Sequence, residues 1–471
     1  MFQRRLLVFA ALVTCIFALS ANAPISAGST SIGEAIQRAS SHEELLQLAS
    51  KLWLPTDPDL PEHLQSQRVH HEKRQRWSAQ LLEKLGNSAS SLSAAASCLH
   101  DGRLHRAIRS ASIPFSKPDR PEKEGRYVRQ ALCAMHTLVG KLTTQGGNHD
   151  SNDEVMNGIQ QLVDRAEAMA DQMPLPHVIE MRFAARGLLA RFGRDIQLTS
   201  MDRRVRNLPF DIIPLGLDWH QIVPDAVAIQ TLLRDIPFRF DTITTRTGAI
   251  VVERRGTAWL AEPGIGALAY SGKLMPPKPV PAVVQAAMRQ AEAAMGMKSA
   301  AIPYFDCALC NHYPDDEAAC KFHTDPEHGM FWERLTCVVA AGDCRRFAFR
   351  PIPGENKWSK WETAGTSVEN NLSPEENAPA AIHLFSGDLV LMWGECNDLF
   401  HHAVYSVEGE GVAASPDGRV SLVLKRAIDR GNGRRGHGLQ GEGRRARRRT
   451  TPTGVDTPVP PQRKASVRRR S

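Results

Sequence analysis

The sequence predicts an α+β protein with a helical first half, a β-rich second half and a basic tail. From about residue 31 to 200, apolar residues recur at i, i+3 or i+4, and i+7. After about residue 205, short runs rich in β-branched and aromatic residues alternate with turn residues. With 471 residues, 42% hydrophobic and 23% charged, the chain can form two or three domains and has the composition of a soluble globular protein.

Residues 1–23 are predicted to be a signal or targeting peptide. Two arginines precede an apolar run from Leu6 to Leu19, and small residues suited to cleavage follow it. The run is shorter than the roughly 20 residues that a spanning helix needs, and no second run of its length follows. We therefore expect a secretory route and no transmembrane segment after removal of the peptide. In an alga with complex plastids, the serine-containing, acid-free stretch up to Glu34 would also suit a two-part plastid address reached through the ER.

Residues 24–204 are predicted to be all-α. Proline and glycine clusters separate the periodic segments at intervals that suggest stacked helical units. A helical scaffold is the first interpretation, and a repeat that binds RNA or protein is the second. The predicted helical segments are 31–53, 72–85, 124–142, 153–173 and 176–193.

Residues 205–429 are predicted to form an antiparallel sandwich or barrel with one prominent helix at 280–296. Turn residues such as AGD, PGEN and SGD separate the β-rich runs. The predicted strands are 248–253, 335–341, 345–352, 381–385, 388–393, 401–407 and 419–425.

Residues 430–471 are a basic tail. They hold 13 Arg and Lys against Glu442 and Asp456, a charge of +11, so the remaining chain sums to -4 to give the total of +7. Because the tail lacks the apolar residues of a core, we expect it to be disordered. A solvated tail, attraction to a polyanion and a nuclear address remain alternatives.

The cysteines do not predict a disulfide framework. The chain has nine, and those between 307 and 396 are irregularly spaced, which mildly favours a reducing compartment. Cys307 and Cys310 could begin a zinc site, but no second CxxC or HxxxH completes it.

A candidate metal site begins at His323 and Asp325. On a strand, residues two apart project from the same face, so both side chains could reach one ion. Non-haem Fe(II) oxygenases use two histidines and one carboxylate, and His402 is the candidate for the third ligand, with His401 pointing the other way. Taken alone, the pair would equally fit a polar turn.

A cationic strand follows at RVSLVLK. Arg419, Ser421, Val423 and Lys425 share one face, and buried cations are costly unless an anion meets them. The dicarboxylate 2-oxoglutarate would supply that anion, with its distal carboxylate on Arg419 and its metal-binding end nearer Lys425.

Five ordered blocks between about residues 250 and 427 resemble the AlkB-type Fe(II)/2-oxoglutarate dioxygenases. ERRGTAWLAE followed by LAYSG resembles the opening P-R-x-T-A-W-Y/F-G and Y-S-G, and CNHYPDDEAACKFHTDPEHG resembles N-x-Y with H-x-D-x-E. CRRFAFR is similar to R-x-F-x-F-R, SGDLVLMWGECNDLFHHAV to G-x-L-x-x-M-x-G with H-x-V, and RVSLVLKRA to R-x-N-x-T-x-R.

The resemblance implies a double-stranded β-helix (jelly-roll) oxygenase domain that uses Fe(II) and 2-oxoglutarate. It assigns His323, Asp325 and His402 as iron ligands and catalytic residues. The implied 2-oxoglutarate contacts are Asn311, Tyr313, Arg419, Ser421 and Lys425. For a flipped base, it implies stacking on Trp259 or Tyr270, a nucleic-acid backbone contact from Arg255, and Glu327 near the base edge.

The sequence departs from the family pattern at four places. Lys425 and Ser421 replace the usual arginine and asparagine, and lysine loses the bidentate fork. WLA at 259–261 replaces W-Y/F-G and is expected to remove an aromatic residue from the substrate wall. An insertion at 355–380 lengthens the gap between Asp325 and His402, and Arg254 stands where proline is usual.

The implied activity is oxidative demethylation of N-alkylated bases in DNA or RNA, as in DNA repair, with release of formaldehyde and succinate. Alkylated nucleic acid would be the partner. Two other classes remain open: an oxygenase acting on protein or lipid, or a non-catalytic, RNA-binding helical scaffold.

Overall fold

The computed structural model describes thirteen stretches of the chain. The predicted targeting peptide (1–23) and basic tail (430–471) lie outside the described residues, as does much of the insertion at 355–380. The described stretches are 32–50, 71–88, 102–112, 121–143, 153–194, 197–224, 227–244, 247–270, 272–298, 302–325, 329–362, 378–405 and 417–428.

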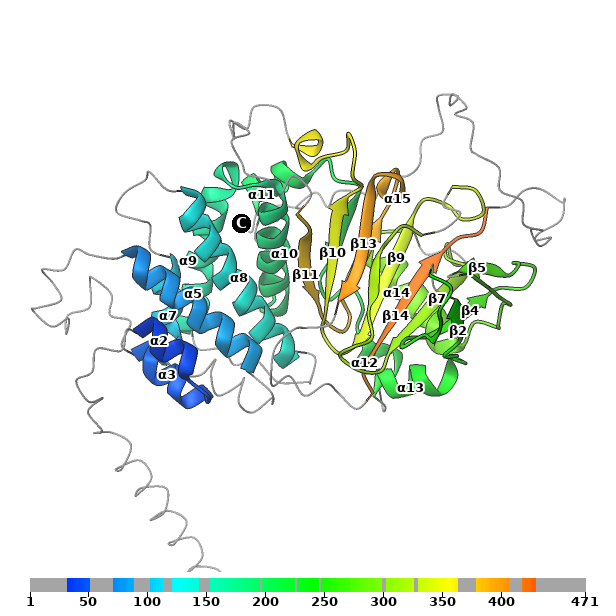
Figure 1. The fold of residues 1–471 in the computed structure, drawn as a ribbon, viewed down its shortest axis with the longest axis horizontal. Helices are drawn as coiled ribbons and strands as arrows, with labels where there is room; N and C mark the ends of the chain where they lie inside the picture. Colours follow the sequence, from blue (N-terminus) through cyan, green and yellow to red (C-terminus); the bar gives the residue numbers. More distant parts are fainter. Residues whose placement is uncertain are drawn as a thin grey trace, which may run out of the picture.

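The first half is helical, as the periodicity predicts. Its elements are α2 (Ile32–Arg38), α3 (His42–Ser50), α5 (His71–Ser88), α7 (Gly102–Ser112), α8 (Pro121–Thr143), α9 (Asp153–Met169), the 3-10 helix η1 (Ala170–Gln172), α10 (Leu175–Arg191) and α11 (Thr199–Val205). Helix α8 packs against α5, α9 and α10, because it buries side chains on several sides. Most of the described helices pack on the neighbours one and two along the chain, such as α5 on α7 and α8, α7 on α9, and α8 on α10. This is the pattern of the stacked helical units that the sequence suggests (Figure 1).

The predicted helical segment 31–53 contains two helices. A capping box begins the second: the Ser41 hydroxyl accepts from the Glu44 amide (3.3 Å), and the Glu44 carboxylate accepts from the amides of Ser40 (2.7 Å) and Ser41 (3.3 Å). These hydrogen bonds satisfy amides that a continuous helix would bond internally. Helix α7, by contrast, was not among the predicted segments.

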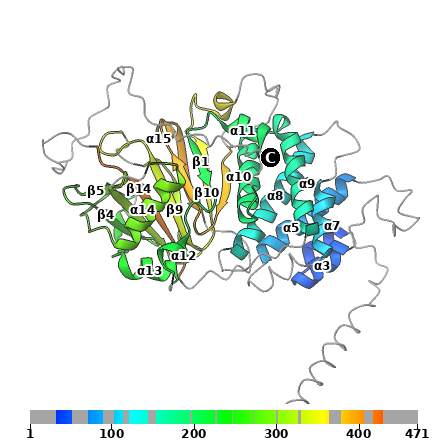
Figure 2. The same ribbon diagram turned by 180° about the vertical axis from the view of Figure 1, so that it is seen from behind.

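A six-stranded antiparallel sheet forms one half of the β region. Its order is β1 (Phe210–Ile213), β12 (Leu389–Met392), β9 (Thr336–Gly342), β14 (Arg419–Lys425), β7 (Cys307–Tyr313) and β4 (Gly256–Ala261). One face is covered by α12 (Trp219–Ile222), α13 (Ala228–Asp235) and α14 (Ala282–Ala294), which lie in front of it in Figure 2. Helix α14 confirms the helix predicted at 280–296.

A four-stranded antiparallel sheet lies opposite. Its order is β11 (Ala380–Leu384), β10 (Arg345–Pro351), β13 (Phe400–Tyr405) and β8 (Cys320–His323). Helix α10 packs against β11 on the outer face of this sheet. The inner faces meet through aromatic side chains, such as Phe210 of β1 stacked on Phe349 of β10, with ring centroids 3.8 Å apart. The metal ligands expected from the sequence lie between the two sheets.

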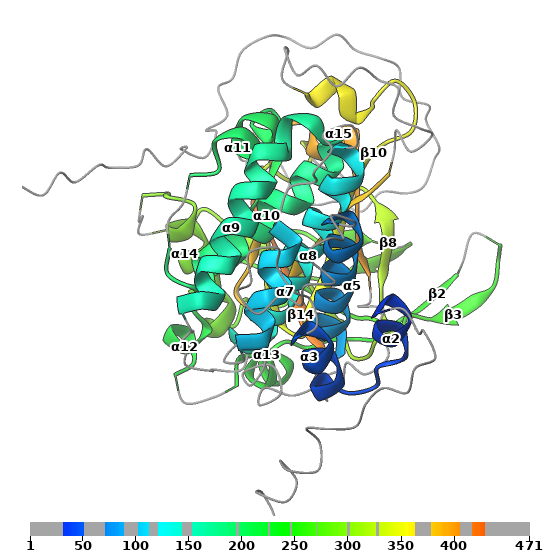
Figure 3. The same ribbon diagram turned by 90° about the vertical axis from the view of Figure 1, so that its left-hand side faces the viewer.

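Two hairpins complete the fold: β2 (Thr242–Thr244) with β3 (Ile250–Val252), and β5 (Leu268–Tyr270) with β6 (Lys273–Met275). The β2–β3 hairpin projects from the body of the molecule in Figure 3. At its base, the Lys273 ammonium donates to Asp241 (2.9 Å), Glu253 and Thr257 (2.9 Å). The hairpin is thereby tied to β4 and β6.

The helical half and the β half share one hydrophobic core. A single cluster of buried residues runs from Ile36 in α2 to Val423 in β14. Within this interface, Arg191 of α10 pairs with Asp388 at 2.9 Å, both fully or almost fully buried. Among the described residues, no helix is long and apolar enough to cross a membrane.

Candidate metal centre

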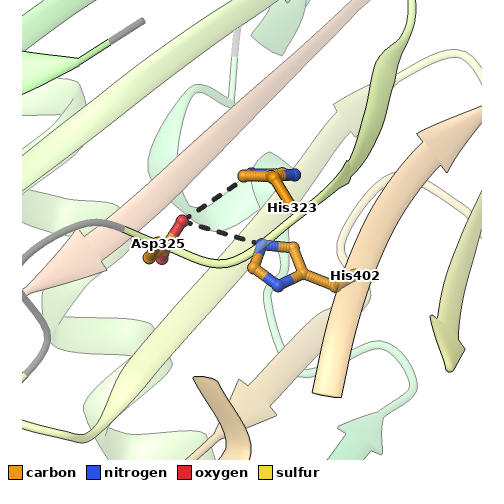
Figure 4. A group of neighbouring side chains, drawn as sticks. All are labelled: His323, Asp325 and His402. Carbon is orange, nitrogen blue, oxygen red and sulfur yellow. Dashed lines mark ion pairs between the residues drawn. The ribbon is translucent and has the colours of Figure 1, made fainter. Parts of the chain in front are cut away.

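His323, Asp325 and His402 converge at one point between the sheets (Figure 4). His323 ends β8 and pairs across the sheet with His402 of β13. Asp325 lies two residues beyond the end of β8, so the expectation that it sits on the strand was wrong, but its carboxylate still meets both rings. One Asp325 oxygen, Oδ1, lies 3.8 Å from Nε2 of His323 and 3.6 Å from Nε2 of His402. One ion could touch all three.

Neighbouring groups fix the orientation of two of the three ligands, His323 and Asp325. Nδ1 of His323 lies 2.8 Å from the Lys321 carbonyl oxygen, which leaves Nε2 for a metal. The Asp325 amide donates to Oδ1 of Asn397 (3.1 Å) in α15 (Cys396–Leu399). The second Asp325 oxygen, Oδ2, accepts from the Lys425 ammonium at 2.6 Å. Asp325 therefore offers one free oxygen, and each histidine offers Nε2.

Burial and charge set the protonation of the ligands. Burial tends to raise the pKa of Asp325, but Lys425 and the two histidines hold that pKa well below its usual range. Burial lowers the pKa of His402, which favours the neutral ring that a metal requires. For His323, burial is outweighed by the nearby Cys320 thiol and Asp325, which raise its pKa to about 9. A cation at its Nε2 would displace that proton.

A row of buried polar side chains, which we call the polar pocket, lies along the inner face of the six-stranded sheet. The register places Arg419 of β14 beside Tyr313 of β7, and Ser421 beside Asn311. All four are at most 4% exposed. Burial raises the pKa of Tyr313 to about 12, although the guanidinium groups of Arg255 and Arg419 favour its ionised form. The row that the sequence predicts on β14 is therefore inside the molecule, on the face of the sheet that carries Tyr313 and Val423.

Arg419 has hydrogen-bonding capacity that the protein does not use. Its Nη1 donates to the Leu384 (3.2 Å) and Asp343 (3.4 Å) carbonyl oxygens, and its Nε to the Ser421 hydroxyl (3.3 Å). Its Nη2 is buried without a hydrogen-bond partner, as is Oδ1 of Asn311. Burial lowers the Arg419 pKa to about 10. A buried guanidinium with a free N–H is a binding site for an anion.

Residues 225–425 match the sequence model of the 2OG-Fe(II) oxygenase superfamily. This region is a 2OG-Fe(II) oxygenase domain. The AlkB-type dioxygenases that the sequence resembles are members of this superfamily. No curated protein matches the chain.

The protein is therefore a 2-oxoglutarate-dependent dioxygenase that uses Fe(II). The donor set fits iron, because two imidazoles and one carboxylate converge and leave further coordination positions open. The chemistry of β14 suits 2-oxoglutarate, because the unpartnered Nη2 of Arg419 can donate to a carboxylate and lies on the same strand face as Lys425, which contacts the ligand Asp325.

The residues expected to contact substrate are less exposed than a base platform requires. Trp259 is 1% exposed, packs edge-on against Trp332 with ring centroids 5.0 Å apart, and donates its indole N–H to the Gly266 carbonyl oxygen (3.0 Å). No base can stack on it in this conformation, so core packing accounts for Trp259. Glu327, the expected contact to the base edge, lies outside the described residues.

Arg255 and Tyr270 form an inner wall of the oxygenase pocket. Both are at most 8% exposed, and the Arg255 guanidinium lies over the Tyr270 ring, 5.4 Å from its centroid. This position places Arg255 inside the molecule and not on the outer surface, where the expected contact with a nucleic-acid backbone would form. Its neighbour Arg254 is exposed and pairs with Glu317.

One sequence-based interpretation was wrong, and one minor alternative is excluded, because alternate strand residues face opposite sides of the sheet. Leu260 packs under the helices on the outer face, so the missing aromatic residue at that position takes nothing from the substrate wall. Cys307 faces the inner cluster and Cys310 the outer one, so they cannot share a zinc ion. His401, as expected, points away from the metal ligands and pairs with Arg350 across the strands.

Sequence reasoning missed three residues that act on the site. Asn397 holds the Asp325 backbone, and Thr336 lies 3.4 Å from the Lys425 ammonium. Arg345, 1% exposed, begins β10 close to Arg419. Arg345 stands in the CRRFAFR block, but the pattern alone does not give its side chain a direction.

Proposed function

We propose that this dioxygenase removes methyl groups from nitrogen atoms of alkylated bases in DNA or RNA. The observation that supports this most is the convergence of the AlkB-like blocks. The segments that carry the resemblance supply β4, β7, β8, β10, β12, β13 and β14, which together surround the metal ligands and the polar pocket. Alkylated nucleic acid is therefore the proposed partner.

The side chains of this site have two separate roles, iron binding and 2-oxoglutarate binding. His323, Asp325 and His402 would hold the iron, and Lys425 keeps Oδ2 of Asp325 occupied so that Oδ1 faces the ion. Arg419, with Tyr313 and Asn311 beside it, would hold the distal carboxylate of 2-oxoglutarate.

When bound, iron and 2-oxoglutarate supply the oxidation. With O₂, 2-oxoglutarate would be converted to succinate and CO₂, with one oxygen atom going to succinate and the other to a C–H bond of the methyl group. The resulting N-hydroxymethyl base loses formaldehyde and is restored. The buried walls formed by Tyr270, Arg255 and Trp259 exclude bulk water from this reaction.

A turnover assay tests the substrate class. Purified protein with Fe(II), O₂ and 2-oxoglutarate is offered methylated DNA or RNA oligonucleotides, peptides or fatty acids, and succinate and formaldehyde are measured. We expect methylated oligonucleotides to stimulate succinate release and to yield equimolar formaldehyde, and His323→Ala to abolish both. Stimulation by peptides or lipids alone would move the substrate to those classes.

We further infer that the two facing sheets form the double-stranded β-helix that the resemblance implies. In support, all strand pairs within both sheets are antiparallel, and the metal ligands lie between the sheets. We propose the expected units 24–204 and 205–429 as a helical scaffold and an oxygenase domain. The shared hydrophobic cluster suggests that the scaffold supports the outer face of the four-stranded sheet.

A further inference from the structure

A second buried guanidinium lies beside Arg419. Arg345 begins β10 on the inner face of the four-stranded sheet, the face that also carries Phe347 and Phe349. Its partner across the strands is Leu384, and the carbonyl oxygen of Leu384 accepts the hydrogen bond from Nη1 of Arg419. Arg345 and Arg419 therefore approach one another from opposite sheets.

Tyr313 connects the two arginines. It pairs with Arg419 across β7 and β14, and the Arg345 guanidinium lies 5.9 Å from the centroid of its ring. The Tyr313 phenol thus lies beside both buried guanidinium groups. Arg345 lies close enough to Arg419 to add to the effect of burial in lowering the Arg419 pKa.

Within the described part of the chain, no carboxylate forms an ion pair with either arginine, although Asp388, which pairs with Arg191, favours the charged form of Arg419 from a greater distance. Arg345 donates only to carbonyl oxygens, from Nη2 to Asp315 and from Nη1 to Ala318 (3.4 Å), and its Nε has no partner. Two buried guanidinium charges without a paired counter-charge are costly, and the cost is removed when an anion lies between them.

We propose that Arg345 is a second binding residue for the distal carboxylate of 2-oxoglutarate, opposite Arg419 and beside Tyr313. The inference rests on the assignment as a 2-oxoglutarate oxygenase and adds a residue to its co-substrate site. A carboxylate has two oxygen atoms, so one can accept from each guanidinium. The site would then strongly prefer 2-oxo acids that carry a second carboxylate.

A merely structural role predicts a different result. Arg345 also holds the 315–318 segment through its carbonyl oxygens, so its loss will lower thermal stability in either case. Only a binding role changes the affinity for 2-oxoglutarate while sparing 2-oxobutyrate, which has the metal-binding end but no distal carboxylate.

The test is calorimetric titration of the full chain with Fe(II) in the absence of oxygen. The variants are Arg345→Gln and Arg345→Lys, with Arg346→Gln as the matched control, because Arg346 is on the opposite face of the same strand. We expect the Kd for 2-oxoglutarate to rise about ten-fold or more in Arg345→Gln, a few-fold in Arg345→Lys, and little in Arg346→Gln. The Kd for 2-oxobutyrate should stay unchanged throughout.

Two outcomes overturn the proposal in different ways. If Arg345→Gln binds 2-oxoglutarate as wild type does, while melting at a lower temperature, Arg345 is structural and the oxygenase assignment stands. If wild type binds Fe(II) but not 2-oxoglutarate, the oxygenase assignment fails, and this inference with it. If Arg345→Gln does not fold, Arg345→Lys decides. The proposal is then overturned if Arg345→Lys has the wild-type Kd for 2-oxoglutarate and the wild-type ratio of the Kd values for 2-oxobutyrate and 2-oxoglutarate.

Discussion

The Lys425 ammonium lies 2.6 Å from Oδ2 of Asp325, and both side chains are at most 4% exposed. Strand β14 is thereby tied to the carboxylate that would hold iron. The family pattern has arginine at this position, whereas here lysine contacts the carboxylate through a single donor. Because a buried carboxylate needs a partner, this pair both stabilises the fold and orients the ligand.

Replacing Lys425 with methionine should weaken both stability and iron binding. Loss of one partner of a buried ion pair costs about 3 to 5 kcal/mol in the free energy of unfolding. With Oδ2 released, iron affinity should fall about 10- to 100-fold, as for other residues that orient a metal ligand. Urea unfolding and Fe(II) titration measure the two effects.

The controls separate the buried ion pair from lysine replacement in general. Lys321→Met removes an exposed ammonium two residues before His323 and should leave iron affinity unchanged. Lys425→Arg keeps the charge and should retain most of the affinity. Equal iron affinity in Lys425→Met and wild type would show that Asp325 needs no partner to bind the metal.

The adjacent histidines 401 and 402 should differ sharply in function. His402→Ala removes a ligand and should abolish stoichiometric iron binding and 2-oxoglutarate turnover. His401→Ala should retain both, because its ring lies on the outer face of β13. Iron content of the purified variants is the measurement. If His401→Ala loses iron while His402→Ala retains it, the register of β13 is shifted by one residue.

The sequence predicted the site better than its surroundings. Strand alternation alone placed Arg419 and Lys425 on one face and separated His402 from His401, because the side-chain period of a strand is two. It did not reveal that Asp325 leaves the strand. Nor could it identify Arg345 as an inward-facing cation, since that depends on which sheet covers β10.

The helical half shows why packing is harder to predict than helix formation. Apolar periodicity identified α8 and α10, but α10 is buried on nearly every side because it lies between α8 and β11. Apolar periodicity identifies one buried face of a helix, but it does not predict which elements pack against the other faces. In the same way, the sequence did not show that Leu260 lies under the helices that cover the outer face of β4.

Mild acid should destabilise the interface between the helices and the sheet. Burial lowers the pKa of His383 in β11 and His177 in α10 to about 3, and that of His136 in α8 well below 6.5. The unfolded chain takes up a proton near pH 6.5, but the folded chain does not. Stability is therefore complete above pH 6.5 and falls as pH drops toward 3, by at most about 2 kcal/mol for each histidine at pH 5.

Urea unfolding at pH 7.5 and pH 5.0 checks this dependence. His383→Gln removes one titrating group that neighbours Arg346, Lys141 and the Thr137 hydroxyl (3.1 Å), so the loss between the two pH values should shrink. His220→Gln, at an exposed position of α12, should leave the loss as in wild type. The prediction fails if His383→Gln and wild type lose the same free energy of unfolding.

Trp259 should prove to be a structural residue and not a platform for substrate. Trp259→Phe loses the hydrogen bond to Gly266 and part of the contact with Trp332, which should lower the free energy of unfolding by about 1 to 3 kcal/mol. Trp332→Phe is the matched control, because the Trp332 indole N–H has no hydrogen-bond partner, and it should cost less. For both variants, kcat and KM per folded molecule should match wild type. A KM for substrate that rises ten-fold only in Trp259→Phe would restore Trp259 to the substrate wall and require the pocket to open around it.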